Sequence, residues 1–153
     1  MAQLSTLGVF SVMWPFTKKM KTLDYWGRSD LHYAARDGDL ATVQKLVSRG
    51  ADVNLQDKHG WAPLHFAAQA LSEEVTTCLL AHGASVDLED GYGNTPLFRA
   101  TFASRGDGGV IRALRSAGAD PGKKNKSGVS ALSLARTIAN NDIAQFYNDI
   151  KDA

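Results

Sequence analysis

The chain has 153 residues, of which 44% are hydrophobic and 22% are charged, as in one globular domain and unlike a disordered chain. Its formal net charge of +1 excludes a strong overall field that would attract nucleic acid or anionic lipid. The single cysteine, Cys78, excludes an internal disulfide and fits a reducing, cytoplasmic location, where we expect it to be a small buried apolar side chain.

Residues 1–23 are expected to form a leader or cap ahead of a main domain at 24–153. An apolar run from Leu4 to Phe16 precedes three lysines, the reverse of the order in a secretory signal. The run has about 13 residues, fewer than the roughly 20 that a membrane-spanning helix needs. An apolar cap or a disordered leader is the favoured interpretation. An amphipathic surface anchor and a translation start at Met13 are the alternatives.

Three sets of residues recur along the chain with one shared period. The first set is spaced by 33, 33 and 35 residues and consists of Gly27, Gly60, Gly93 and Gly128. The same spacing relates Leu31, Leu64, Leu97 and Leu132. It also relates Gly50, Gly83 and Gly118. Because the three markers share even the irregular last step, they predict four repeated units, at about 24–56, 57–89, 90–124 and 125–150.

Each unit is expected to hold two helices, with capping signals in matching places. The first helix begins after a hydroxyl side chain at Ser29, Thr95 and Ser130, or with a proline at Pro63 and Pro96. Small alanine pairs, at 34–35 and 67–68, allow close packing. In the first unit the second helix carries an apolar stripe of Leu40, Val43, Leu46 and Val47. Gly50, Gly83 and Gly118 suit the left-handed residue that ends this helix.

The two extra residues of the third unit are expected between its helices. The segment 103–109 holds three glycines and an Arg-Gly-Asp tripeptide, which we interpret as coincidental. Glycines at this density predict a flexible surface loop, where an insertion costs little.

The period and its motifs resemble those of the ankyrin-repeat family. The resemblance rests on Ala62-Pro63-Leu64-His65 and Thr95-Pro96-Leu97-Phe98, and on closing stretches such as Gly50-Ala51-Asp52. It covers residues 24 to about 150. It implies an all-α repeat fold, a solenoid of about four helix-turn-helix units with projecting β-hairpin loops. In this family the motif histidine ties loops together, so His32 and His65 are expected to be structural.

The last two units depart from the motif. Phe98 and Ser133 stand where the first two units have histidine, and the fourth unit also lacks the proline. Terminal units of a repeat stack commonly differ because one of their faces meets water. We therefore expect the fourth unit to be a C-terminal cap.

No catalytic, cofactor or metal pattern stands out. Residues 106–109 lack the preceding strand and the Gly-Lys-Ser/Thr ending of a phosphate-binding loop. The four histidines, His32, His59, His65 and His82, show no metal-ligand spacing. No motif holds a histidine near Cys78. We expect a non-enzyme without cofactor, metal or small-molecule substrate.

The resemblance implies a partner protein bound by the hairpin tips and the exposed face of each first helix. The matching positions are Tyr25, Trp26, Arg28, Arg36, Lys58, His59, Trp61, Gln69, Tyr92, Asn94 and Phe102. Trp26, His59 and Tyr92 occupy one position of successive units, and interface hot spots are enriched in such side chains. The alternative is that these aromatic residues pack on one another to stiffen the hairpins.

Charge is unevenly distributed along the sequence. Residues 52–90 carry seven acids against one base, and residues 99–126 carry seven bases against two acids. A partner with complementary charge would be steered into one register, whereas the acidic half would repel a phosphate backbone. The alternative is that both stretches are solvated faces only.

Three functions fit these features. The chain is similar to short, free-standing bacterial ankyrin proteins, which suggests a cytoplasmic immunity protein that blocks a toxin and is monomeric when free. The alternatives are a scaffold or regulator of a cellular enzyme, and a membrane-attached adaptor that uses the N-terminal run. The sequence favours a protein partner over nucleic acid or a membrane.

Overall fold

The computed structural model describes residues 22–138 and 141–151. The apolar run and the lysines that follow it lie outside these residues. The described part contains eight α-helices and a 3-10 helix: α2 (Asp30–Asp37), α3 (Leu40–Ser48), α4 (Pro63–Gln69), α5 (Glu73–Ala81), α6 (Pro96–Ala103), α7 (Gly109–Ser116), α8 (Ala131–Thr137), α9 (Asn141–Ala144) and η2 (Gln145–Tyr147).

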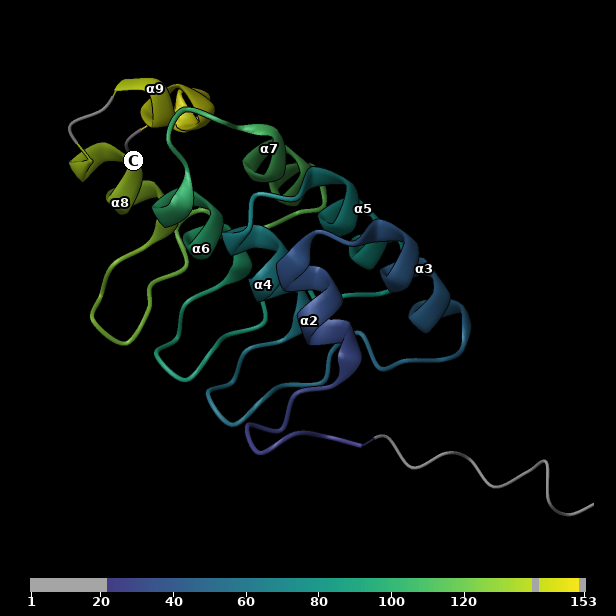
Figure 1. Cartoon of the computed structure of the whole chain (residues 1–153). Helices are drawn as coiled ribbons and strands as arrows, with labels where there is room; N and C mark the ends of the chain where they lie inside the picture. The colour runs from purple at the N-terminus through teal and green to yellow at the C-terminus, as the bar shows by residue number, and fades with distance from the viewer. Residues whose placement is uncertain (1–21, 139–140, 152–153) are drawn as a thin grey trace, which may run out of the picture.

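The helices stack in two rows (Figure 1). In the first row α2 contacts α4, α4 contacts α6 and α6 contacts α8; in the second row α3 contacts α5 and α5 contacts α7. Each first-row helix also packs on the helix that follows it in the chain. The loops that connect successive pairs project to one side of the stack (Figure 1). The described residues contain no β-strand, so the hairpin geometry expected of these loops stays a prediction.

The predicted helix boundaries agree with the structure. Pro63 and Pro96 are the first residues of α4 and α6. The Thr95 hydroxyl accepts the Phe98 N–H, and the Ser130 hydroxyl accepts the Ser133 N–H. Two residues after the second-row helices α3, α5 and α7, the chain turns at Gly50, Gly83 and Gly118, whose φ angles of 81°, 88° and 91° are left-handed.

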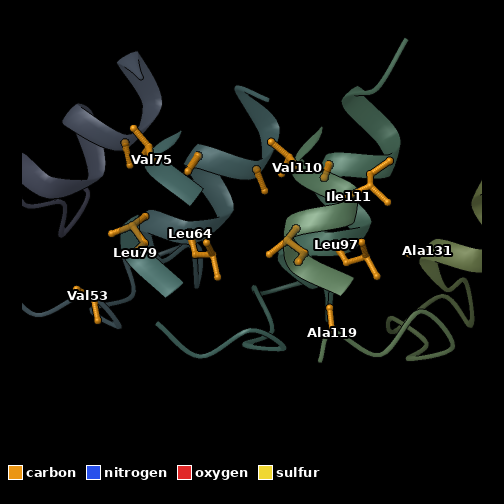
Figure 2. Close-up of a cluster of buried hydrophobic side chains, with 14 of the residues drawn as sticks. Val53, Leu64, Val75, Leu79, Leu97, Val110, Ile111, Ala119 and Ala131 are labelled. Carbon is orange, nitrogen blue, oxygen red and sulfur yellow. The ribbon is translucent and has the colours of Figure 1, made fainter. Parts of the chain in front are cut away.

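The core lies between the two rows. The repeated leucines Leu31, Leu64 and Leu97 are fully buried, and Figure 2 shows the last two beside Leu79, Val110 and Ile111. In α3 only Val43 of the predicted stripe is fully buried, because α3 packs on α2 but has a second-row neighbour, α5, on one side only among the described residues. Leu132 is likewise half-buried at the other end. The leucines that recur with the repeat period therefore lie where each helix packs on the next.

The inserted segment joins α6 to α7 as predicted, but its glycines pack closely against side chains from other parts of the chain. A Cβ atom at Gly108 would lie 2.1 Å from the Phe146 ring, and one at Gly109 would lie 2.2 Å from a Glu73 carboxylate oxygen. The Ser104 hydroxyl closes the loop by donating to the Asp107 carbonyl at 2.7 Å. Gly108 thus permits close contact with the C-terminal segment and Gly109 permits close contact with α5, so the loop is packed where the sequence predicted a flexible one.

The C-terminal segment is anchored on α6 by a buried tyrosine. Tyr147 is 2% exposed, and its hydroxyl lies 2.5 Å from the Thr101 hydroxyl. Burial raises the pKa of Tyr147 to about 12. No helix in the described ranges is long and apolar enough to span a membrane.

Candidate partner-binding surface

Four projecting loops, here called the tip loops, share one hydrogen-bonding pattern. They comprise residues 24–28, 57–61, 90–94 and 125–129. In each, the side-chain oxygen of the first residue (Asp24, Asp57, Asp90 or Asn125) accepts the backbone N–H groups two and four residues further on, at 2.8–3.0 Å. One oxygen thereby sets the turn and directs the two residues that follow it outwards.

Neighbouring tip loops are also joined to one another. The Lys58 N–H donates to the Trp26 carbonyl at 2.9 Å, and the Gly91 N–H donates to the His59 carbonyl at 2.8 Å. The Lys126 N–H donates to the Tyr92 carbonyl at 3.0 Å. These bonds hold the four loops in register, so that equivalent residues form rows along the stack.

The outward-facing side chains of the tip loops form a row that we call the tip edge: Tyr25, Trp26, Lys58, His59, Tyr92 and Lys126, all exposed. Trp26 meets Tyr25 edge-on at 5.2 Å between ring centroids and lies 5.4 Å from His59. Tyr25 and Tyr92 are still 77% and 67% exposed. The aromatic residues therefore pack on one another in part, and Tyr25 and Tyr92 remain mostly exposed.

A second layer lies between the tip loops and the first-row helices. Arg28 donates to Asp57 at 2.8 Å and lies 5.0 Å from the Phe66 ring centroid. Phe66 packs on Trp61 with centroids 4.9 Å apart. Arg99 lies 4.2 Å from the Trp61 centroid and is ion-paired with Asp90. These side chains alternate between cation and ring, which stabilises both partners.

The carboxylates of this layer are buried with their partners. The side chains of Asp57 and Asp90 are 0% exposed. Burial alone would raise the pKa of Asp90. The Arg99 guanidinium and the Asn94 and Tyr92 N–H groups hold the pKa below its ordinary value. Asp90 is therefore an ionised, fully paired group and not a site for a ligand.

The two motif histidines link the first-row helices to the next tip loop. Nδ1 of His32 accepts the Ser29 N–H at 3.0 Å, so Nε2 carries the proton and donates to the Trp61 carbonyl at 3.1 Å. His65 makes the equivalent bonds, from the Ala62 N–H and to the Asn94 carbonyl, both at 3.1 Å. Burial lowers the pKa of both histidines. This geometry is the structural role that the resemblance implied.

The first-row helices present a further exposed row beside the tip loops. Arg36, Gln69 and Phe102 lie on α2, α4 and α6 at the 33-residue spacing and are all exposed. Phe102 is 66% exposed, which is unusual for a phenylalanine on a folded helix. Arg36 pairs with Asp37 at 2.8 Å and lies over the Tyr33 ring.

Three of the predicted binding residues lie deeper than expected. Asn94 is 6% exposed, and its carbonyl and side chain bond His65 and Asn125. Asn94 therefore cannot meet a partner on the surface. Arg28 and Trp61 are half-buried in the second layer and can touch a partner only at their edges. Positions that are equivalent in successive tip loops therefore share a backbone conformation but can differ in solvent exposure.

Sequence reasoning missed the residues that build the tip loops. Asp24, Asp57, Asp90 and Asn125 follow the same 33, 33 and 35 spacing as the glycines, which is the signal that would have identified them. Phe66 and Arg99 were also missed, as was Leu23, which is 46% exposed beside the tip edge.

The uneven charge is smaller at the surface than in the sequence. Asp57 and Asp90 were counted as acids, yet both are buried against arginine. Among the bases, Arg99 pairs with Asp90, and Arg115 pairs with Asp149 at 2.6 Å. Part of the charge that could have steered a partner is therefore neutralised by ion pairs within the chain.

One cysteine–histidine contact was not anticipated. Cys78 is half-buried on α5, less than expected, and its Sγ lies 3.8 Å from His82 Nδ1. The same Nδ1 lies 2.7 Å from the Cys78 carbonyl oxygen, to which it must donate its proton. It cannot at the same time accept a proton from the thiol, and burial raises the pKa of Cys78. The pair therefore lacks the geometry of a nucleophile and its base.

No cluster of three metal-ligating side chains occurs in the described ranges. A family model of ankyrin repeats, in three copies, matches residues 31–125. No curated protein gives a significant match to the chain.

Proposed function

Since the chain belongs to the ankyrin-repeat family, whose repeats are protein–protein interaction modules, we propose that it binds a partner protein through the tip edge and the exposed face of α2, α4 and α6. The observation that carries the proposal is the alignment of exposed aromatic side chains, Tyr25, Trp26 and Tyr92 on the tip edge and Phe102 on α6.

Exposed aromatic side chains in a row are costly unless something covers them. A monomer exposes single apolar side chains freely, but contiguous apolar patches mark interaction sites. Aromatic rings also carry the largest share of binding free energy in interfaces. The backbone bonds between the tip loops hold the rings in place before a partner arrives, which lowers the entropy lost on binding.

The finer proposal is that the partner is a toxin and that this chain is its cytoplasmic immunity protein, monomeric when free and without enzymatic activity. We count α8 and α9 as a fourth, divergent unit that closes the stack. The alternatives are a cellular enzyme that the chain scaffolds or regulates, and an adaptor attached to a membrane through the N-terminal run.

The test of the binding surface is the double variant Trp26→Ala with Tyr92→Ala. Both side chains are exposed, so we expect the stack to stay folded while affinity for the native partner falls by about 2 kcal/mol or more. A partner recovered from the source cell by cross-linking provides the titrant for calorimetry. The control is Gln44→Ala with Lys45→Ala on α3, where both residues are exposed on the other row. Equal affinity in the two double variants would show that the tip edge is not the binding surface.

The immunity role needs its own experiment. Cells that express a toxin encoded beside this gene should survive when the chain is co-expressed and die when the Trp26→Ala, Tyr92→Ala variant replaces it. If the wild-type chain neither protects the cells nor forms a complex, the immunity role is wrong. Recovery of an abundant enzyme instead would favour the scaffold. Deletion of residues 1–16 without a change of location would exclude the membrane adaptor.

A further inference from the structure

The tip edge consists of two parallel rows with different chemistry. Each tip loop projects two consecutive residues. The first row is Tyr25, Lys58, Gly91 and Lys126, and the second is Trp26, His59, Tyr92 and Ser127. The first row therefore carries the two lysines, whereas the second has a ring in three of its four positions and no lysine.

Gly91 leaves a gap in the first row for a steric reason. A Cβ atom there would lie 2.9 Å from the His59 carbonyl oxygen, which is the acceptor of the bond between these two loops. The Lys126 ammonium group reaches back over this gap and donates to the Gly91 carbonyl at 2.7 Å. The Lys58 ammonium group lies 4.2 Å from the Tyr25 ring centroid.

The acidic groups of the same loops are turned inwards or already engaged. Asp57 and Asp90 have no exposed side-chain surface. Asp24 accepts the N–H groups of Trp26 and Arg28 at 2.8 Å and the Tyr33 hydroxyl. In the part of the chain that the structure describes, neither Lys58 nor Lys126 forms an ion pair. The tip edge thus presents its lysines and rings outwards, and of the three aspartates of these loops only Asp24, at the first loop, is exposed.

We infer that the tip edge recognises an acidic, extended segment of the partner protein. Its carboxylates lie at Lys58 and Lys126, and its apolar side chains lie on Trp26, His59 and Tyr92. Opposite charges on the rim of an interface set the register, and the rings supply the contact area. This inference rests on the proposed function, because it names the chemistry of the partner at the same surface.

A nucleic acid is the other polymer with negative charge and flat rings, and it fits less well. Its affinity depends on the number of phosphates that cations neutralise. The tip edge offers two lysines in a chain of net charge +1, too few for a phosphate backbone. An acidic peptide needs only local complementarity. A single-stranded RNA therefore serves as the competing outcome of the test.

The test uses fluorescein-labelled peptides of alternating Glu and Tyr, Ser and Tyr, or Lys and Tyr, together with oligouridine, added to the full chain and followed by fluorescence anisotropy. We expect the Glu–Tyr peptide to bind at least about tenfold more tightly than the other three probes. Its affinity should also fall as salt is raised.

Charge reversal locates the interaction. Lys58→Glu with Lys126→Glu should weaken Glu–Tyr binding about tenfold or more, and the neutral pair Lys58→Gln with Lys126→Gln should weaken it less. The matched control is Lys45→Glu with Arg49→Glu on the other row, which changes the net charge equally at two exposed positions. Circular dichroism establishes that each variant is folded.

The inference is overturned if the control weakens binding as much as the tip-edge reversal, if the probes bind equally or not at all, or if oligouridine binds more tightly than the acidic peptide. Its failure is distinguishable from that of the proposed function. The affinity for a native partner could fall on substitution of Trp26 and Tyr92 but stay unchanged with salt and with the charge reversal at Lys58 and Lys126. That result would support protein binding and would exclude only the acidic segment.

Discussion

At the scale of single residues, the buried carboxylates of Asp57 and Asp90 do most to shape the candidate surface. Each has its side chain fully shielded, organises its own tip loop through backbone N–H groups and is paired with an arginine. A buried charge of this kind is tolerated only with its partner in place, because removal of the partner leaves an uncompensated ion in a low dielectric.

Arg99→Ala should therefore destabilise the protein by roughly 3 kcal/mol, since it strands the Asp90 carboxylate and uncovers Trp61. Arg36→Ala is the matched control, because the Arg36–Asp37 pair is more than half exposed and should be worth less than about 0.5 kcal/mol. Urea unfolding measures both values. Similar losses in the two variants would contradict the structural role of the Arg99–Asp90 pair.

The paired histidines make stability depend on pH. His32 and His65 are held neutral in the fold with lowered pKa values, whereas the unfolded chain takes up a proton near pH 6.5. The stability that they contribute is complete above pH 6.5 and is lost as the pH falls below it. Two such groups give a slope of at most about 2.7 kcal/mol per pH unit.

Urea unfolding between pH 7.5 and pH 5 should show this loss. His65→Gln is expected to lower stability at neutral pH and to remove about half of the acid dependence. His82→Gln, at the exposed residue that follows α5, is the matched control for the substitution. If the wild-type protein were as stable at pH 5 as at pH 7.5, the assignment of neutral, hydrogen-bonded imidazoles would be wrong.

At the scale of elements, the tip loops depend on how closely neighbouring backbones approach. Gly60 has a φ of 79°, and a Cβ atom there would lie 2.6 Å from the Gly91 nitrogen. Gly128 occupies the equivalent place in the last loop with a φ of 77°, and a Cβ atom there would meet nothing within 4 Å. The two positions share a backbone conformation and differ only in their surroundings.

This difference separates backbone strain from close approach. Gly128→Ala should cost roughly 1–2 kcal/mol, the strain of a left-handed alanine. Gly60→Ala should cost about 1–3 kcal/mol more, because the second and third loops must also move apart. Thermal unfolding gives the difference. Equal losses at the two glycines would show that the loops are not pressed together as described.

The same elements show what the sequence could predict. Pro63, Pro96 and Thr95 mark helix starts because their effect on the backbone is local. The 33-residue spacing could be recognised because similar helix pairs stack on one another. The exposure of Asn94 could not be predicted. It occupies the position of Trp61 and Arg28, and whether it is covered depends on bonds from His65 and Asn125 in the neighbouring units. The packing of residues 104–108 was missed because Phe146 comes from a distant part of the chain.

At the scale of the whole molecule, the protein is a row of helix pairs in which the main contacts of each pair are with its neighbours. Within the residues that the structure describes, interior pairs are covered on both sides and the end pairs on one. Stability should therefore vary along the stack and not be shared evenly.

Hydrogen exchange should be slowest in α4 and α6, which have a helix packed on each side, and faster in α2 and α8. We expect α9, only four residues long, to exchange first. Mass spectrometry after peptic digestion resolves these segments. Uniform protection from α2 to α9 would indicate a single cooperative unit and would contradict this gradient.

The bonds between the tip loops have a mechanical consequence. Each loop is tied to the next by one backbone bond, from Lys58 to Trp26, from Gly91 to His59 and from Lys126 to Tyr92. Side-chain bonds add to these links, since Arg28 donates to Asp57 and the Lys126 ammonium group donates to the Gly91 carbonyl. A load that a partner applies to one loop is therefore passed on to its neighbours, and the spacing of the exposed side chains is kept along the whole edge.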